Sequence, residues 1–350
     1  MPASQRLSPG GASDDLAAAQ ALVARFDALR QTKQIPGLAI AIVRDTTVLI
    51  ETGLGVASIA RGDPVTAETP FNIASVTKTI SGVVALRLAE RGTLDLDRPM
   101  SQYDGFAEFC VDVRGAGGIF FGDYGCADAS LTLRHVLSME ANGVPGTRFL
   151  YNPPSFSWAS RPMMQVTGRS FSDLTAELVL VPAGMLRSAR MHRRLPLRDD
   201  LARALATPYH VDSAGQVVES PPPGPQGDGA AGGIISTAHD LARFDVALTN
   251  DRLLSPASRQ RMWTAGRAPS GAILPYGIGW FVQELQGETL LWHSGLWEGA
   301  YSAIYLRVPD RRLTLILLAN SDGLWWNNPL DAAMIERSPF VQAFLAAFPR

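Results

Sequence analysis

A serine and a lysine lie three residues apart, at positions 75 and 78, where a predicted helix begins. Side chains at this spacing share one face of a helix, so the Lys78 amine can reach the Ser75 hydroxyl. An apolar run at helical spacing follows and stops at Gly92. The pair is a nucleophile beside a base, an arrangement suited to covalent catalysis.

The scarcity of lysine makes this pair more informative than its spacing alone. The chain has 29 arginines and two lysines, Lys33 and Lys78. Arginine stays charged at any accessible pH, whereas a desolvated lysine can act as a base. Because the chain uses arginine for nearly every cationic side chain, we interpret Lys78 as a candidate base. The alternative is an exposed helix on which the serine and the lysine are incidental.

Composition excludes several functional classes. The chain has 350 residues, 46% of them hydrophobic and 18% charged, with a formal charge of −2. It has no cluster of basic residues for nucleic acid or an anionic membrane, and no apolar run long enough to span a bilayer. Because residues 1–11 contain no apolar signal core, we expect a cytoplasmic protein, or a periplasmic or secreted one if a signal has been removed. The oligomeric state stays open.

The two cysteines and five histidines give no sign of a metal site. Cys110 and Cys126 could form a disulfide in an oxidising compartment, but two cysteines without a CxxC spacing are weak evidence for a bridge or a metal site, and we favour free thiols. None of the histidines has a partner at ligand spacing. We therefore predict neither a metal nor a cofactor.

The hydrophobic pattern predicts an α+β fold with one antiparallel sheet. A helix from Ser13 precedes a hairpin over 38–43 and 47–52, and strands return over 277–285, 289–293, 300–307 and 313–319. Helices are expected over 328–337 and 340–348, whereas 104–130 and 219–233 are expected to be irregular. The sheet domain would comprise residues 12–70 plus 249–350, with a mainly helical domain, 71–248, inserted and the active site between them.

Three further segments join the Ser75 pair, namely 145–152, 232–241 and 292–299. In this order the chain resembles the serine β-lactamase and penicillin-binding-protein superfamily, and its class C-like branch in particular. That branch includes family VIII esterases, D-aminopeptidases and DD-peptidases. The resemblance extends from Ile35 through the stretch 276–280 to the last strand and implies the same α+β fold.

The resemblance implies specific roles for the matching residues. Ser75 would be the nucleophile, and Lys78 with Tyr151 would accept its proton, in an order that the sequence leaves open. The backbone N–H groups of Ser75 and Leu296 would form the oxyanion hole. Tyr151 could instead be a core aromatic residue. In the segment 232–241 we favour a tight turn and a Thr237 cap, with the glycine pair near the pocket.

The substrate side departs from the family pattern. His293, Ser294 and Gly295 replace the usual lysine-threonine-glycine motif, and Asn152 lies one place before its expected position. We assign these residues and Trp297 to substrate binding and favour a pocket-lining His293, with a buried strand residue as the alternative. The changes weaken the attraction to an anionic β-lactam and predict a carboxylesterase for small or medium esters. The alternatives are a D-amino-acid peptidase or amidase, a weak β-lactamase, and a non-catalytic sensor.

Overall fold

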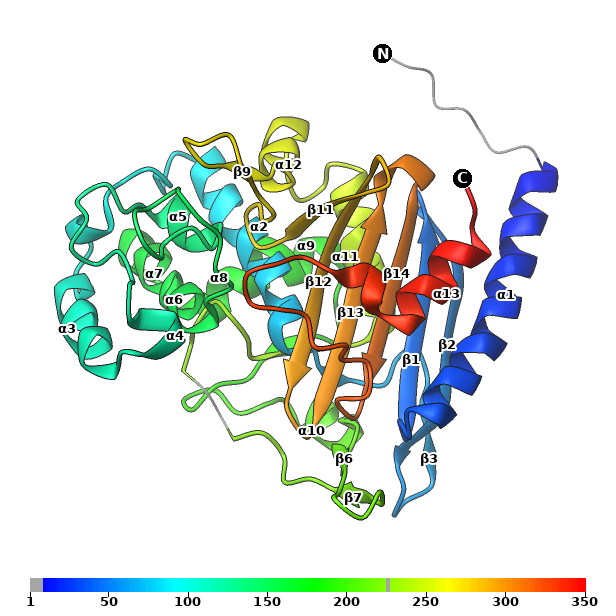
Figure 1. Ribbon diagram of the computed structural model, residues 1–350. Coiled ribbons are helices and arrows are strands. Elements are labelled where there is room, and N and C mark those ends of the chain that lie inside the picture. The colour runs from blue at the N-terminus through cyan, green and yellow to red at the C-terminus, as the bar shows by residue number, and fades with distance from the viewer. Residues whose placement is uncertain (1–8, 225–226) are drawn as a thin grey trace.

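A seven-stranded antiparallel sheet forms the centre of the computed structural model, which describes residues 9–224 and 227–350 (Figure 1). The strand order is β11-β12-β13-β14-β1-β2-β3. These strands are β1 (Gly37–Arg44), β2 (Thr47–Ser58), β3 (Asp63–Pro64), β11 (Phe281–Leu285), β12 (Glu288–Trp297), β13 (Tyr301–Val308) and β14 (Leu313–Ala319). The predicted α+β class and the sheet built from both ends of the chain are confirmed.

The two ends of the chain meet at the centre of this sheet. β1 pairs antiparallel with β14, from Leu38 opposite Ala319 to Arg44 opposite Leu313. Both strands are almost entirely buried, which explains why each is a continuous apolar run without polar alternation. Two-residue turns at Asp45-Thr46 and Gln286-Gly287 close the hairpins on either side.

Helices cover both faces of the sheet (Figure 1). On one face α1 (Pro9–Thr32) packs beside α13 (Pro339–Ala347), with the rings of Phe26 and Phe340 5.7 Å apart. On the other face lie α11 (Ala238–Thr249) and α2 (Thr77–Glu90). α11 contacts the central strands, although the predicted helical domain includes most of it; the predicted domain division stays a prediction.

Shorter elements build the region between β3 and β11. The helices are α3 (Phe106–Ala116), α4 (Gly118–Phe121), α5 (Leu133–Leu137), α6 (Pro153–Trp158), α7 (Ser160–Thr167), α8 (Phe171–Thr175), α9 (Val181–Ala183), α10 (Asp199–Ala204) and α12 (Pro256–Met262). The strands are β4 (Phe71–Asn72), β5 (Ala189–Arg190), β6 (Tyr209–Val211), β7 (Val217–Glu219), β8 (Ile234–Ser236), β9 (Gly266–Arg267) and β10 (Ile273–Leu274).

Two predicted segments differ from the structure. Residues 104–130 are not irregular, because they contain α3 and α4. Residues 328–337 are not a helix and contain only a 3₁₀ turn at Ile335–Arg337. There the Asn328 side chain binds the Ala332 carbonyl and the Met334 N–H, both at 2.9 Å, so it takes the backbone groups that a helix would pair.

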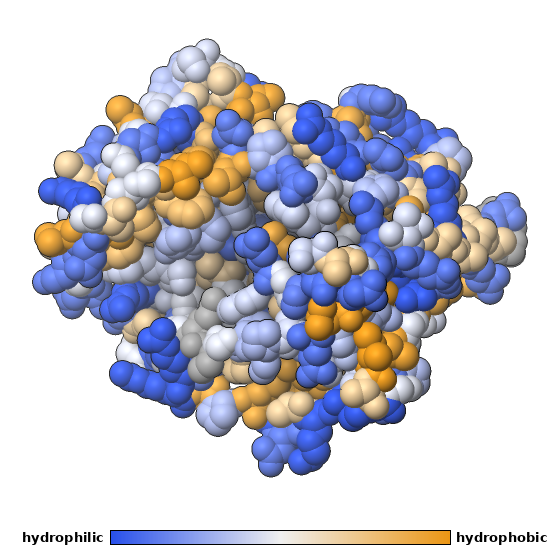
Figure 2. Space-filling view, turned by 60° about the horizontal axis from the view of Figure 1, so that its bottom comes forward, coloured by the Kyte–Doolittle hydropathy of each residue, from blue (hydrophilic) through white to orange (hydrophobic). Residues whose placement is uncertain are grey.

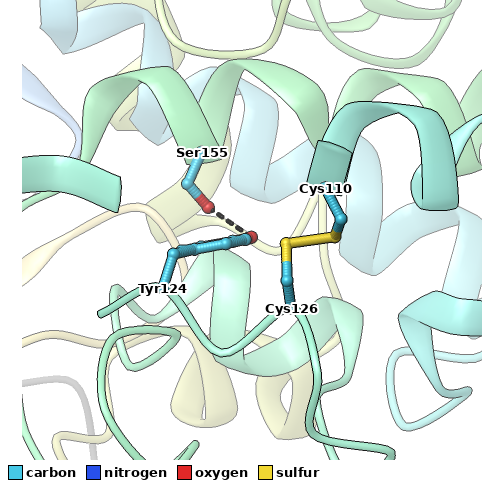
Figure 3. The surroundings of a disulfide bond; sticks show 4 residues. All are labelled: Cys110, Tyr124, Cys126 and Ser155. Carbon is cyan, nitrogen blue, oxygen red and sulfur yellow. Dashed lines mark hydrogen bonds between the residues drawn. A yellow bond between two sulfur atoms is a disulfide. The ribbon is translucent and has the colours of Figure 1, made fainter. Parts of the chain in front are cut away.

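Cys110 and Cys126 form a disulfide, so the prediction of free thiols was wrong (Figure 3). α3 and the following loop bring their Cα atoms to 5.6 Å, which sequence spacing could not reveal. Beside the bond, the Tyr124 hydroxyl accepts a 2.8 Å hydrogen bond from Ser155 in α6 (Figure 3). The disulfide therefore closes the 104–130 segment on itself, and the hydrogen bond between Ser155 and Tyr124 joins that segment to the helix that follows Tyr151.

The face of the molecule drawn in Figure 2 is mostly hydrophilic. On the face drawn in Figure 2, hydrophobic residues form small separate patches between hydrophilic ones. Within the described part of the chain, no helix combines the length and the apolar character that crossing a bilayer requires.

The disulfide generates a stability prediction. It closes a loop of 16 residues, so replacing both cysteines by alanine should lower the free energy of unfolding by about 3 kcal/mol. Urea unfolding with and without dithiothreitol measures this. The reductant should lower the wild-type midpoint and leave that of the double variant unchanged; a wild-type midpoint indifferent to reductant would contradict the expectation.

Candidate active site

Ser75 lies in a short 3₁₀ turn, Ala74–Val76, between β4 and α2. The residue before it, Ala74, has φ of +46°, a left-handed conformation that an alanine rarely adopts. The Asn72 side chain holds this turn by accepting a 2.9 Å hydrogen bond from the Ala74 N–H. Strained backbone of this kind persists only where its surroundings fix it, which is typical of functional sites.

Lys78 is fully buried in the first turn of α2. Its Nζ lies 2.8 Å from the Ser75 Oγ and 3.0 Å from the Ala231 carbonyl oxygen. Burial lowers the pKa of Lys78 well below its ordinary value, and no carboxylate of the described residues forms an ion pair with it. A neutral amine beside a hydroxyl is the protonation state that a general base needs.

Tyr151 lies on the other side of the amine, with its ring centre 5.2 Å from the Lys78 Nζ. Burial raises the pKa of Tyr151, and a hydrogen bond with Ser75 opposes this only in part. The phenol is therefore protonated in the resting protein. Of the two predicted bases, the electrostatics favour Lys78 as the group that takes the first proton.

Glycines allow the sheet to approach these residues closely. A Cβ added to Gly295 in β12 would lie 2.3 Å from the Ile73 carbonyl, and one on Gly279 would lie 2.3 Å from the Lys78 carbonyl. Both contacts exclude any larger residue. The first one places Leu296 beside Ser75, and both residues line the same cleft. Their role as an oxyanion hole stays a prediction.

The active-site cleft has a volume of about 570 Å³. Its walls come from the Ser75 turn, from α6, from the end of β12 and from the loops before α10 and β8. They are formed by Ala74, Ser75, Lys78, Pro153, Pro154, Ser157, Arg193, Gly227, Gly229, Ala231, Gly232, Leu296, Trp297 and Glu298. Trp297 lines the cleft, and its role in substrate binding stays a prediction. Gly232 also lines the cleft, whereas Thr237 caps α11.

Asn152 does not line this cleft, contrary to its predicted position in substrate binding. Its side chain is buried, and its Oδ1 caps α6 by accepting a 3.0 Å bond from the Ser155 N–H. Its Nδ2 donates to the Phe120 carbonyl at 2.8 Å and to the Asn142 Oδ1 at 2.9 Å. An amide with all these bonds made inside the protein has little capacity left for a substrate.

His293 is also buried rather than exposed to the cleft, and so are Ser294 and Gly295. Its Nδ1 lies 2.6 Å from the Ser294 carbonyl and must donate there, so Nε2 accepts from the Tyr276 hydroxyl at 2.9 Å. Burial, and secondarily Lys78, lower the pKa of His293 well below its ordinary value. The imidazole is neutral, and the strand carries no cation at this position.

Tyr276 is a residue near the site that sequence reasoning missed. The Tyr276 ring lies 6.4 Å from that of Tyr151 and holds the neutral His293. Tyr276 belongs to a stretch, 276–280, that contributed to the family resemblance, which was a usable signal.

The described residues contain no group of three or more His, Cys, Asp or Glu side chains that could hold a metal ion. The reactive groups that the site brings together are the Ser75 hydroxyl, the Lys78 amine and the Tyr151 phenol.

Comparison with known proteins identifies the family of this chain. A family model described as Beta-lactamase matches residues 22–335. Penicillin-binding protein 4 of Amycolatopsis lactamdurans is 28% identical over 331 residues, covering 85% of this chain and 84% of that protein. A D-aminopeptidase of Brucella ovis is 26% identical over 336 residues, covering 89% of this chain but only 61% of that protein.

A solved structure supports the fold. The D-amino acid amidase from Ochrobactrum anthropi SV3, complexed with L-phenylalanine amide, superposes with a TM-score of 0.73. The two chains are 19% identical, and the match covers 95% of this chain and 98% of that one. At this identity the likeness concerns the fold alone.

Replacing Lys78 by methionine should separate activity from stability. Hydrolysis should fall by about 10²-fold or more because the base is lost. Stability at pH 7 should rise, since each unit by which burial lowers the pKa of Lys78 costs about 1.4 kcal/mol.

The stability gain of Lys78→Met should depend on pH, because the folded and unfolded chains bind the Lys78 proton differently. The unfolded lysine stays protonated up to about its ordinary pKa of 10.5, whereas the folded one does not, so wild-type stability rises with pH in between. The advantage of Lys78→Met in the free energy of unfolding should therefore shrink between pH 7 and pH 10. An advantage independent of pH would show that Lys78 is charged in the folded protein.

Glu140 generates a second pH prediction. Burial raises its pKa from 4.5 to about 7, and its Oε1 packs where Gly266 leaves room. The folded chain holds the proton to higher pH than the unfolded chain, so the stability that Glu140 contributes is complete below pH 4.5 and is lost as pH rises through 7. Glu140→Gln should be more stable than wild type at pH 8, by on the order of 1 kcal/mol, and little different at pH 4.5. Thermal unfolding at both pH values measures this, and an equal difference at both would exclude titration of Glu140.

Proposed function

Because the chain belongs to the beta-lactamase family of serine hydrolases, we propose that it acts through an acyl-enzyme on Ser75 and hydrolyses small or medium carboxylic esters. The observation that carries this proposal is the 2.8 Å contact between the Ser75 Oγ and a fully buried lysine amine. The hydroxyl and amine stand at hydrogen-bond distance in a cleft, which is the geometry for activating a nucleophile.

Acylation follows from the arrangement of the three side chains. As the Ser75 Oγ attacks the ester carbonyl, its proton passes to the Lys78 amine. The carbonyl oxygen becomes an oxyanion, which the N–H groups of Ser75 and Leu296 would stabilise. When the C–O bond to the alcohol breaks, the leaving oxygen takes the proton back from Lys78, directly or through the Tyr151 hydroxyl.

Deacylation repeats these steps with water. The neutral Lys78 amine accepts a proton from a water molecule as its oxygen attacks the acyl carbon. The bond to the Ser75 Oγ then breaks, the proton returns to the serine and the carboxylic acid leaves. The positive end of α2 favours the developing charge on Ser75 throughout.

The interior positions of two side chains favour an ester over a β-lactam. A neutral, buried His293 offers no cation from β12 to the carboxylate that β-lactams and peptide C-termini carry. The Asn152 amide is committed to the interior and does not reach a lactam side chain. A simple ester needs neither contact.

Amide hydrolysis is the second candidate, with a D-amino-acid amide as substrate. The exposed carboxylate of Glu298 lines the cleft, where it could pair with a free α-ammonium group. The relatedness to a D-aminopeptidase points the same way. Weak β-lactamase activity and a non-catalytic sensor are further alternatives, which turnover measurements separate.

The Cys110–Cys126 disulfide bears on the compartment. Disulfides persist in oxidising environments and are rare in the cytosol. It favours a periplasmic or secreted location over the cytoplasmic one.

A panel of chromogenic substrates tests the proposed function. We expect steady-state turnover of short p-nitrophenyl esters well above that of a chromogenic cephalosporin and of D-alanyl p-nitroanilide. Ser75→Ala should reduce ester turnover by about 10³-fold or more, because the covalent route is lost.

The controls separate the alternatives. Thr79→Ala in the same helix controls for folding, since Thr79 bonds only the Val76 carbonyl. Faster amide or cephalosporin turnover would reject the ester preference, whereas no turnover of any substrate by folded protein would reject the enzyme itself.

A further inference from the structure

A second cleft of about 940 Å³ adjoins the active-site cleft. Five residues line both of them: Pro154, Ser157, Arg193, Gly227 and Gly229. A substrate bonded at Ser75 can therefore extend over Pro154 and Ser157 into a space larger than the active-site cleft itself. The remaining walls come from α6, α7, the start of α8 and the 192–195 loop.

Positive charge predominates on these walls. Three arginines line the cleft, namely Arg161, Arg193 and Arg194, against two aspartates. One of the aspartates, Asp228, is already neutralised by the buried Arg190, whose Nε lies 3.2 Å from its Oδ1. In a chain with a formal charge of −2, this excess is local and not part of a basic surface.

Two of the lining arginines are available to a ligand. Arg161 and Arg194 are exposed, and neither forms a side-chain ion pair or hydrogen bond with the residues that the structure describes. Most arginines elsewhere in the chain pair with a carboxylate or a carbonyl. A guanidinium held in a concave site without a carboxylate partner is well suited to bind a carboxylate or a phosphate.

Hydrogen bonds to Asp228 hold the wall of this second cleft. Asp228 accepts hydrogen bonds from the Ser172 N–H at 3.1 Å and the Ser172 hydroxyl at 2.8 Å, in addition to its pair with Arg190. A Cβ on Gly229 would lie 1.9 Å from the Ser157 Oγ, so the wall that the two clefts share requires a glycine at this position. The cleft wall is thus held by buried contacts, whereas Arg161 and Arg194 are exposed.

We propose that this arginine cleft (Arg161, Arg193 and Arg194 with the walls around them) binds an anionic group at the end of the substrate far from the scissile bond. The proposal rests on the proposed function and names its substrate class as esters that carry a remote carboxylate or phosphate. It also fits the active-site cleft, because the exposed Glu298 lines that cleft and does not line the arginine cleft. A remote anion would direct the substrate toward the arginines and away from Glu298.

Matched ester pairs test the proposal. On the acyl side, mono-p-nitrophenyl esters of dicarboxylic acids with four to eight carbons are compared with the neutral esters of equal length. On the alcohol side, 4-acyloxybenzoates are compared with 4-acyloxybenzamides, and a phosphonate replaces the carboxylate in a parallel set. We expect kcat/KM to favour the anionic member of at least one pair by tenfold or more, mainly through KM, with an optimum chain length.

Arginine variants test whether a preference for anionic esters arises from the arginine cleft. In Arg161→Gln/Arg194→Gln the ratio of kcat/KM between anionic and neutral esters should fall at least fivefold, and added salt should reduce the wild-type ratio. Arg203→Gln, an exposed arginine of α10 outside both clefts, removes one charge and should keep the wild-type ratio. If the double variant fails to fold, each single variant should lower the ratio by itself.

The outcomes distinguish this inference from the proposed function. Turnover of neutral esters with no preference for any anionic partner would overturn the arginine cleft and leave the esterase intact. A preference that survives in the double variant would also overturn it. No turnover of neutral or anionic esters would reject the proposed function, and with it the substrate class.

Discussion

The arrangement of the active site depends on one constraint, the burial of the Lys78 amine. An amine without a carboxylate partner in a low-dielectric environment loses its proton, and only then can it accept one from Ser75. Water is excluded from the Lys78 amine by close backbone packing at Gly279 and Gly295. The aromatic rings of Tyr151 and Phe156 cover the amine as well. The packing around α2 is thus part of the chemistry, because looser packing would return the lysine to its charged state.

The reactive side chains could be predicted from the sequence, whereas the environment of the substrate could not. Ser75, Lys78 and Tyr151 are fixed by local spacing and by motif order, and the structure brings them together. Asn152 and His293 were assigned to the cleft because motif position does not reveal which way a side chain points. Each is turned inward by partners distant in sequence, such as Phe120 and Tyr276.

In the fold, too, features set by local sequence could be predicted, whereas features set by contacts between distant residues could not. Continuous apolar runs predicted the central strands, and both hairpin turns lie where short polar pairs interrupt them. The disulfide and α3 were missed because their cause is tertiary: the cysteines lie 16 residues apart and meet only when the segment packs on α6. The basic character of the second cleft was hidden for the same reason, since Arg161 and Arg194 come from separate segments.

The pairing of β1 with β14 has a consequence for the order in which the molecule is completed. During synthesis β1 emerges early, but its neighbour on one side, residues 313–319, is made some 270 residues later. Until then the hairpin of β1 and β2 has an open hydrophobic edge, and Ser75 lacks β12 beside it. The active site can therefore be completed only after nearly the whole chain has been synthesised. Until then, the nascent protein must avoid self-association through the unpaired edge of β1.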